Sequence, residues 1–119
     1  MADLFTDEGK VKAMTGIKNS ISALLLCDSS GNTISSVGSA GSSFAVNATT
    51  GQLSNTSEIV FTIESSFVGD TAALVKISDG STTPKTLIQL DLETSVELTT
   101  AGETEFEAGE LNCSFASTV

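Results

Sequence analysis

The chain has 119 residues and a net charge of −10 at pH 7, because 15 Asp and Glu side chains outweigh 5 basic ones. It contains no His, Trp or Tyr, and all its basic residues are lysines, which excludes histidine-based catalysis, histidine metal sites and arginine clamps on phosphate. The charge also disfavours nucleic acid and anionic membranes as partners, since both would repel the chain.

The first predicted element is a short amphipathic helix over residues 7–18. Thr6 is a suitable N-cap, and the two acidic residues after it suit the positive end of the helix dipole. Three apolar residues would form one stripe along this helix: Val11, Met14 and Ile17. Gly16 weakens the helix, so packing must hold it. We interpret the stripe as a docking surface, for the chain's own sheet by preference or for another subunit.

From residue 21 onwards, short apolar runs alternate with turn residues, a pattern typical of antiparallel strands. The runs 21–27 and 33–37 flank a turn that contains glycine, which predicts a first hairpin. A flexible loop over 38–43 leads to a second predicted hairpin, from 44–48 to the alternating run 59–63.

The second half of the chain continues this pattern. Residues 72–78 and 86–92 predict two strands joined by a turn at Asp79. In 104–108, apolar or small residues alternate with acidic ones, which predicts an amphipathic strand whose outer face carries Glu103, Glu105 and Glu107. A final strand is expected over 111–115.

These elements predict an all-β fold. About eight strands with one short N-terminal helix, and no linker or internal repeat, indicate one domain over residues 1–119. We expect an antiparallel β-sandwich of jelly-roll or Ig-like type.

Two cysteines, Cys27 and Cys113, are too few and too far apart for a zinc ribbon or a CxxC redox motif. Our main interpretation is that both are buried apolar thiols. A disulfide between them is the alternative, which requires maturation outside the cell.

Three groups of residues invite a functional interpretation. The turns that begin at Asp28 and Asp79 contain several oxygen-bearing side chains, but they lack the acidic spacing of a calcium loop, so Asx turns are the better interpretation. The alternating Glu103, Glu105 and Glu107 lie on one face of one strand and could not flank a sugar from two sides. We therefore predict no catalytic, metal or cofactor site.

No segment approaches the about 18 apolar residues of a membrane span, and the first residues lack a basic segment followed by a hydrophobic one. We expect synthesis in the cytosol without export. Three glycosylation sequons, at Asn47, Asn55 and Asn112, carry no meaning in that setting.

The order of segments resembles a family of small β-rich structural proteins of tailed bacteriophages. The similar segments are Leu-Phe-Thr-Asp-Glu-Gly-Lys at 4–10, the Asp-containing turn after the first apolar strand, and residues 47–61, 73–80 and 96–111. The last of these is similar to the family's paired closing strands around a Gly turn.

This resemblance implies a non-enzymatic virion component present in multiple copies. It would pack on the capsid as a decoration or cement protein, or on the tail or fibre as an adaptor. Its partners would be capsid or tail subunits and copies of itself, with a trimer favoured. The alternative is a module that binds the host surface through the turns at 28–43 and 79–85.

Overall fold

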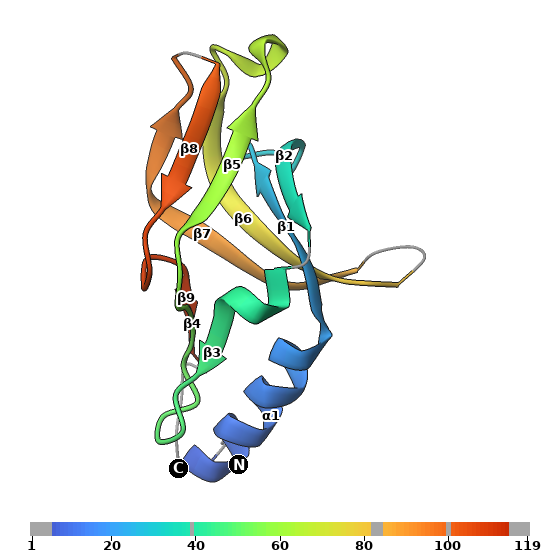
Figure 1. The fold of residues 1–119 in the computed structure, drawn as a ribbon, viewed down its shortest axis with the longest axis vertical. Coiled ribbons are helices and arrows are strands. Elements are labelled where there is room, and N and C mark those ends of the chain that lie inside the picture. Colours follow the sequence, from blue (N-terminus) through green and yellow to red (C-terminus); the bar gives the residue numbers. More distant parts are fainter. Residues whose placement is uncertain (1–5, 39, 82–84, 100, 115–119) are drawn as a thin grey trace.

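The computed structural model describes residues 6–38, 40–81, 85–99 and 101–114, and these form one α-helix, two short 3-10 helices and three antiparallel sheets (Figure 1). The mostly β fold predicted from the sequence is therefore confirmed. The elements are α1 (Asp7–Ser20), β1 (Ile21–Cys27), β2 (Thr33–Gly38), the 3-10 helix η1 (Ala40–Ser43), β3 (Phe44–Val46), β4 (Leu53–Asn55), β5 (Ile59–Ile63), the 3-10 helix η2 (Ser65–Phe67), β6 (Thr71–Asp79), β7 (Thr86–Glu97), β8 (Gly102–Phe106) and β9 (Asn112–Cys113).

Helix α1 forms where the sequence predicts it. The Thr6 hydroxyl accepts a hydrogen bond from the backbone N–H of Gly9 at 3.0 Å, which satisfies one of the free donors of the first turn. Met14 is buried in the core and Ile17 packs against that core. The helix lies beside β3 and η1 at one end of the molecule (Figure 1).

The largest sheet has the strand order β2-β1-β6-β7. Its β1–β2 and β6–β7 hairpins confirm two local predictions, because in each case consecutive apolar strands flank a turn. The β1–β6 pairing aligns Ile21 with Asp79 and Cys27 with Leu74. The two hairpin turns therefore lie at opposite ends of β1.

The remaining strands form a sheet of order β3-β4-β9 and a two-stranded sheet of β5 and β8. The second predicted hairpin is thus correct only for β3 and β4, since residues 59–63 pair with β8 instead. The pairing that the resemblance implies for the strands on either side of Gly102 is not formed, because β7 pairs with β6 and β8 with β5.

Three smaller predictions need correction. The loop expected over 38–43 contains η1, whose Gly41 lies so near β1 that a Cβ would meet the carbonyl oxygen of Ile21 at 2.8 Å. The strand expected over 104–108 ends at Phe106, because residues 107–110 form a turn closed by a hydrogen bond from Glu110 N to Glu107 O. The strand expected over 111–115 is Asn112–Cys113, and Phe115 lies outside the described residues.

One core joins the three sheets and the helix. The four-stranded sheet contributes Leu24, Leu26, Val75 and Ile77, and the two-stranded sheet contributes Phe61 and Phe106. The rings of Phe61 and Phe106 meet edge to face, with centroids 5.9 Å apart. Figure 1 shows β5 and β8 lying over the larger sheet, and these shared core residues hold them there.

The contact of α1 with the β3–β4 turn depends on Gly51. This residue has φ of 75°, and a Cβ there would lie 2.8 Å from the Lys10 backbone carbon. We expect Gly51→Ala to destabilise the fold by about 1–3 kcal/mol, because left-handed strain and a backbone clash add together.

The control for this prediction is Gly16→Ala in the same helix, where a Cβ meets nothing within 4 Å. We expect that variant to gain about 0.5–1 kcal/mol. Urea denaturation of both variants measures the effect, and equal stability changes would contradict the prediction.

Candidate functional site

A groove of 640 Å³ lies between β7 and β8. Its apolar lining comes from half-buried or buried side chains that include Leu90, Leu92 and Phe106. The charged residues that line it among the described residues are all acidic: Asp91, Glu105 and Glu110. The groove therefore combines an apolar floor with a negative rim.

One wall of this groove is the edge strand β7, and the other is the end of β8 together with residues 109–112. β7 is the last strand in the order β2-β1-β6-β7, and β8 pairs only with β5 among the described strands. The β6–β7 register jumps from Leu74↔Asp91 to Ala72↔Val96, so β7 bulges between Asp91 and Val96. Bulges re-aim side chains and interrupt pairing, and this one lies along the groove.

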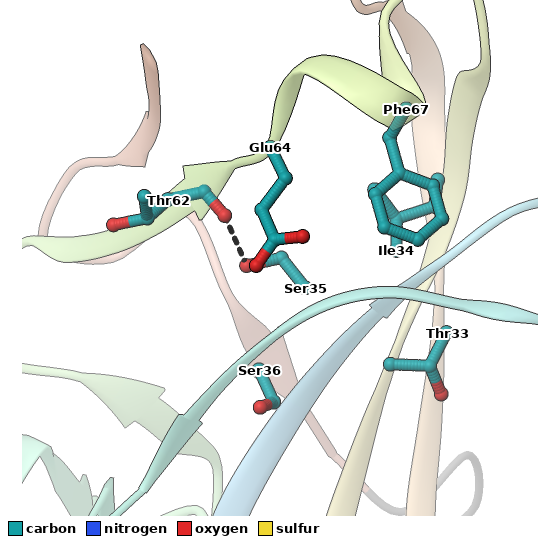
Figure 2. A pocket seen from close by; sticks show the side chains of 7 residues that line it. All are labelled: Thr33, Ile34, Ser35, Ser36, Thr62, Glu64 and Phe67. Carbon is teal, nitrogen blue, oxygen red and sulfur yellow. Dashed lines mark hydrogen bonds between the residues drawn. The ribbon is translucent and has the colours of Figure 1, made fainter. Parts of the chain in front are cut away.

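A second hollow, of 340 Å³, lies between β2 and the segment from β5 to η2 (Figure 2). Ile34 and Phe67 supply apolar surface, and hydroxyl groups surround them. The Ser35 hydroxyl donates to the Thr62 carbonyl at 2.7 Å, as the dashed line in Figure 2 shows. That bond links β2 to β5, so the Ser35 hydroxyl connects two sheets of the fold.

The outer face of β8 is acidic, as predicted. Glu103 and Glu105 are exposed, whereas Phe106 is buried on the opposite face. The charge of Glu105 raises the pKa of Glu58, and the charges of Glu107 and Glu103 add to this effect. Like charges therefore repel one another across this face.

The Asp28 turn is an Asx turn rather than a cation loop. One carboxylate oxygen of Asp28 accepts hydrogen bonds from the backbone N–H groups of Ser30 and Asn32, each at 2.9 Å. The bond from Asn32 is the main reason why the pKa of Asp28 is lowered. Asp79 acts in the same way in its own turn, where bonds from Lys85 and Ser81 lower its pKa.

These three carboxylates predict how stability depends on pH. Because the neighbouring carboxylates hold the pKa of folded Glu58 above its ordinary value of 4.5, the folded state gains stability as pH falls from neutral towards 4.5. The stabilisation by Asp28 and Asp79 is fully present above 3.8 and is lost as pH falls through their lower folded pKa values. Chemical denaturation across pH should show a rise and then a fall.

Two variants separate these contributions to the pH dependence of stability. We expect Glu58→Gln to reduce the gain in the free energy of unfolding as pH falls from neutral towards 4.5. We expect Asp28→Asn to reduce part of the loss below 3.8. A profile of Glu58→Gln that retains the full rise would contradict the assignment.

The docking stripe of α1 faces its own chain. Met14 is 2% exposed, whereas Val11 and Ile17 are half-buried. The structure thus favours the interpretation in which the stripe covers the chain's own fold, and the surface it contacts is β3 and η1 rather than the largest sheet.

Cys27 is buried in β1 and Cys113 is half-buried in β9, and both are free thiols in this structure. Burial raises the pKa of each. The two strands belong to different sheets, and no disulfide joins the two cysteines in the structure.

Sequence reasoning missed the polar centre of the fold, Asn55. Its amide nitrogen donates to the carbonyls of Ser57 at 3.0 Å and Glu107 at 2.9 Å. Its side-chain oxygen accepts from the backbone N–H groups of Gly109 and Leu111. This side chain is buried and occupied, so the sequon at Asn55 is closed to modification in the folded chain.

The chain matches no protein-family model, no curated protein and no solved structure. Within the described residues, no group of three or more Cys, Asp or Glu side chains is arranged to hold a metal ion. Nor is any described helix long and apolar enough to cross a membrane.

Proposed function

We propose that the chain is a non-enzymatic structural component of a tailed-phage virion. It packs in multiple copies on the capsid as a decoration or cement protein, or on the tail or fibre as an adaptor. Its partners are other virion subunits and copies of itself, with a trimer favoured. It is made in the host cytoplasm and functions in the particle.

The observation that carries this proposal is the extended arrangement of small sheets. The radius of gyration is 15.0 Å, against about 13.5 Å expected for a compact chain of this length. The molecule measures 48 × 27 × 27 Å, and two of its sheets have only three and two strands. Such a fold leaves much surface and several strand edges that contact with neighbours would stabilise.

The finer fold assignment belongs to the same proposal. Residues of β1 and β6 share one core with residues of β5 and β8. Two layers packed in this way support an antiparallel sandwich of jelly-roll or Ig-like type. A rigid sandwich with free edges is well suited to repeated packing on a larger surface.

The alternative function, binding to the host surface, relies on the turns at 28–43 and 79–85. Only 28–32 of the first segment is a turn, because β2 and η1 occupy most of the rest. The two segments begin at opposite ends of β1, so a compact receptor would contact one of them, and residues 82–84 of the second lie outside the described residues. We therefore prefer the structural role.

An add-back experiment tests the proposal. Particles assembled without this chain are mixed with the purified full chain, washed, and examined for bound protein and for resistance to heat. We expect saturable binding at a fixed position on the capsid or tail. A chain that binds neither these particles nor their isolated subunits would contradict the proposal.

A further inference from the structure

We propose that the groove between β7 and β8 binds an extended, lysine- or arginine-bearing segment of a different protein as an added β-strand. This inference goes beyond the proposed function, since it concerns the chemistry of the partner and holds for a partner of any origin. It rests on two features of the groove, its strand edge and its charge.

The backbone argument concerns the free edge of β7 and the end of β8 that faces it. β7 and β8 follow each other in the chain, yet each forms its ladder with another strand, β6 or β5. On the opposite side, the Ser35–Thr62 hydrogen bond links β2 to β5, so the two sheets are joined there and separated at the groove. An exposed edge presents N–H and C=O groups that an extended chain can pair with.

The side-chain argument concerns the lining. Alternate side chains of an added strand point to opposite faces. Apolar ones would meet Leu90, Leu92 and Phe106, and the intervening ones would meet the acidic rim. Since every charged lining residue among those described is a carboxylate, the complementary side chains are lysine or arginine.

The same charges exclude a second copy as the preferred occupant. The charged residues of the groove are carboxylates and a second copy carries a net charge of −10, so a second copy is poorly matched in charge to this groove. Three of the five lysines lie on α1, and Lys76 donates to the Gly31 carbonyl within its own chain. Among the described strands, none at a sheet edge contains a lysine, so no described edge of a second copy offers the alternation of apolar and basic residues that the groove fits.

Peptide binding to the full-length chain tests the inference. The probe is a fluorescently labelled octapeptide of alternating valine and lysine, and binding is followed by anisotropy at 50 and 150 mM salt. Two comparison peptides have the same composition: one groups the four lysines together, and one carries N-methyl groups on alternate amides. We expect each to bind at least about tenfold more weakly, because one loses the alternation and the other the edge hydrogen bonds.

Matched variants locate the site. Asp91→Asn with Glu105→Gln removes two carboxylates from the groove and is expected to weaken binding by about three- to tenfold. Glu8→Gln with Asp70→Asn removes two exposed carboxylates elsewhere and should leave binding unchanged. Circular dichroism and urea denaturation confirm that both variants are folded.

Several results would overturn the inference. Equal affinity for all three peptides would show that they are attracted non-specifically to an acidic protein. An equal loss of peptide affinity in the groove variant and the control variant would lead to the same conclusion. An absence of binding, or self-association of the chain that the groove variant abolishes, would also overturn it. These measurements use the purified chain and no particles. A negative result here would therefore not contradict the proposed function, which the add-back experiment tests separately.

Discussion

Asn55→Ala is expected to destabilise the fold by about 3–5 kcal/mol, which is a large share of the stability of a domain of this size. The side chain is 2% exposed and makes four hydrogen bonds to backbone groups of residues 57, 107, 109 and 111. Truncation would leave the buried N–H of Leu111 and the part-buried carbonyls of Ser57 and Glu107 without these partners, whereas the N–H of Gly109 keeps its bond to the backbone carbonyl of Asn55. Each buried group left unpaired costs about 1–3 kcal/mol. Urea denaturation followed by circular dichroism measures the change.

Two further variants sharpen this prediction. Asn112→Ala removes an exposed amide that donates one hydrogen bond to Gly109 and should cost less than about 1 kcal/mol. Asn55→Asp keeps the shape but turns a carboxylate towards two carbonyl oxygens, so it should be destabilised most at neutral pH and less in acid. If Asn55→Ala lowers the free energy of unfolding no more than Asn112→Ala does, the hydrogen bonds of Asn55 are not important for stability and the prediction is wrong.

Phe61→Ala is expected to cost about 3–5 kcal/mol, because it opens a cavity between the two-stranded sheet and the larger one. Phe61 is fully buried and its ring meets the Phe106 ring edge to face. Phe67→Ala is the matched control, since that ring is only half-buried beside the second hollow.

The same denaturation assay compares these variants, with Phe61→Leu as an intermediate case expected to cost about 1–2 kcal/mol. Equal losses for Phe61→Ala and Phe67→Ala would show that the core does not lie where the structure places it.

The helix and the two hairpins could be predicted because the residues that specify them, caps, apolar repeats and turn residues, lie within a few positions of one another in the sequence. Thr6 and the apolar stripe predict α1, and a turn between two alternating runs predicts the β1–β2 and β6–β7 hairpins. Asp28 and Asp79 were correctly interpreted as turn residues, since a short carboxylate reaches backbone groups two residues on.

The long-range pairings could not be predicted in the same way. β5 pairs with β8 across about forty residues, and β4 pairs with β9 across nearly sixty, and no spacing in a single sequence specifies such partners. The groove depends on these pairings, because it exists only where β7 and β8 fail to pair with each other. The acidic face of β8 was predictable, but the edge beside it was not.

Asn55 gave a signal that could have been used. Leu53 and Asn55 lie on the same face of β4, and the apolar residue at 53 indicates that this face is buried. A polar side chain on a buried face must find hydrogen-bond partners. The partners themselves, in residues 107–111, become visible only once the chain is folded.

The central claim is that this chain is a repeated structural part of a virion. Its most direct test is quantitative mass spectrometry of purified particles, which gives the number of copies relative to the major capsid protein. We expect on the order of hundreds of copies for a capsid decoration protein, or about a dozen for a tail or fibre adaptor, since symmetric assemblies repeat their subunits. Absence of the chain from purified particles would contradict the claim.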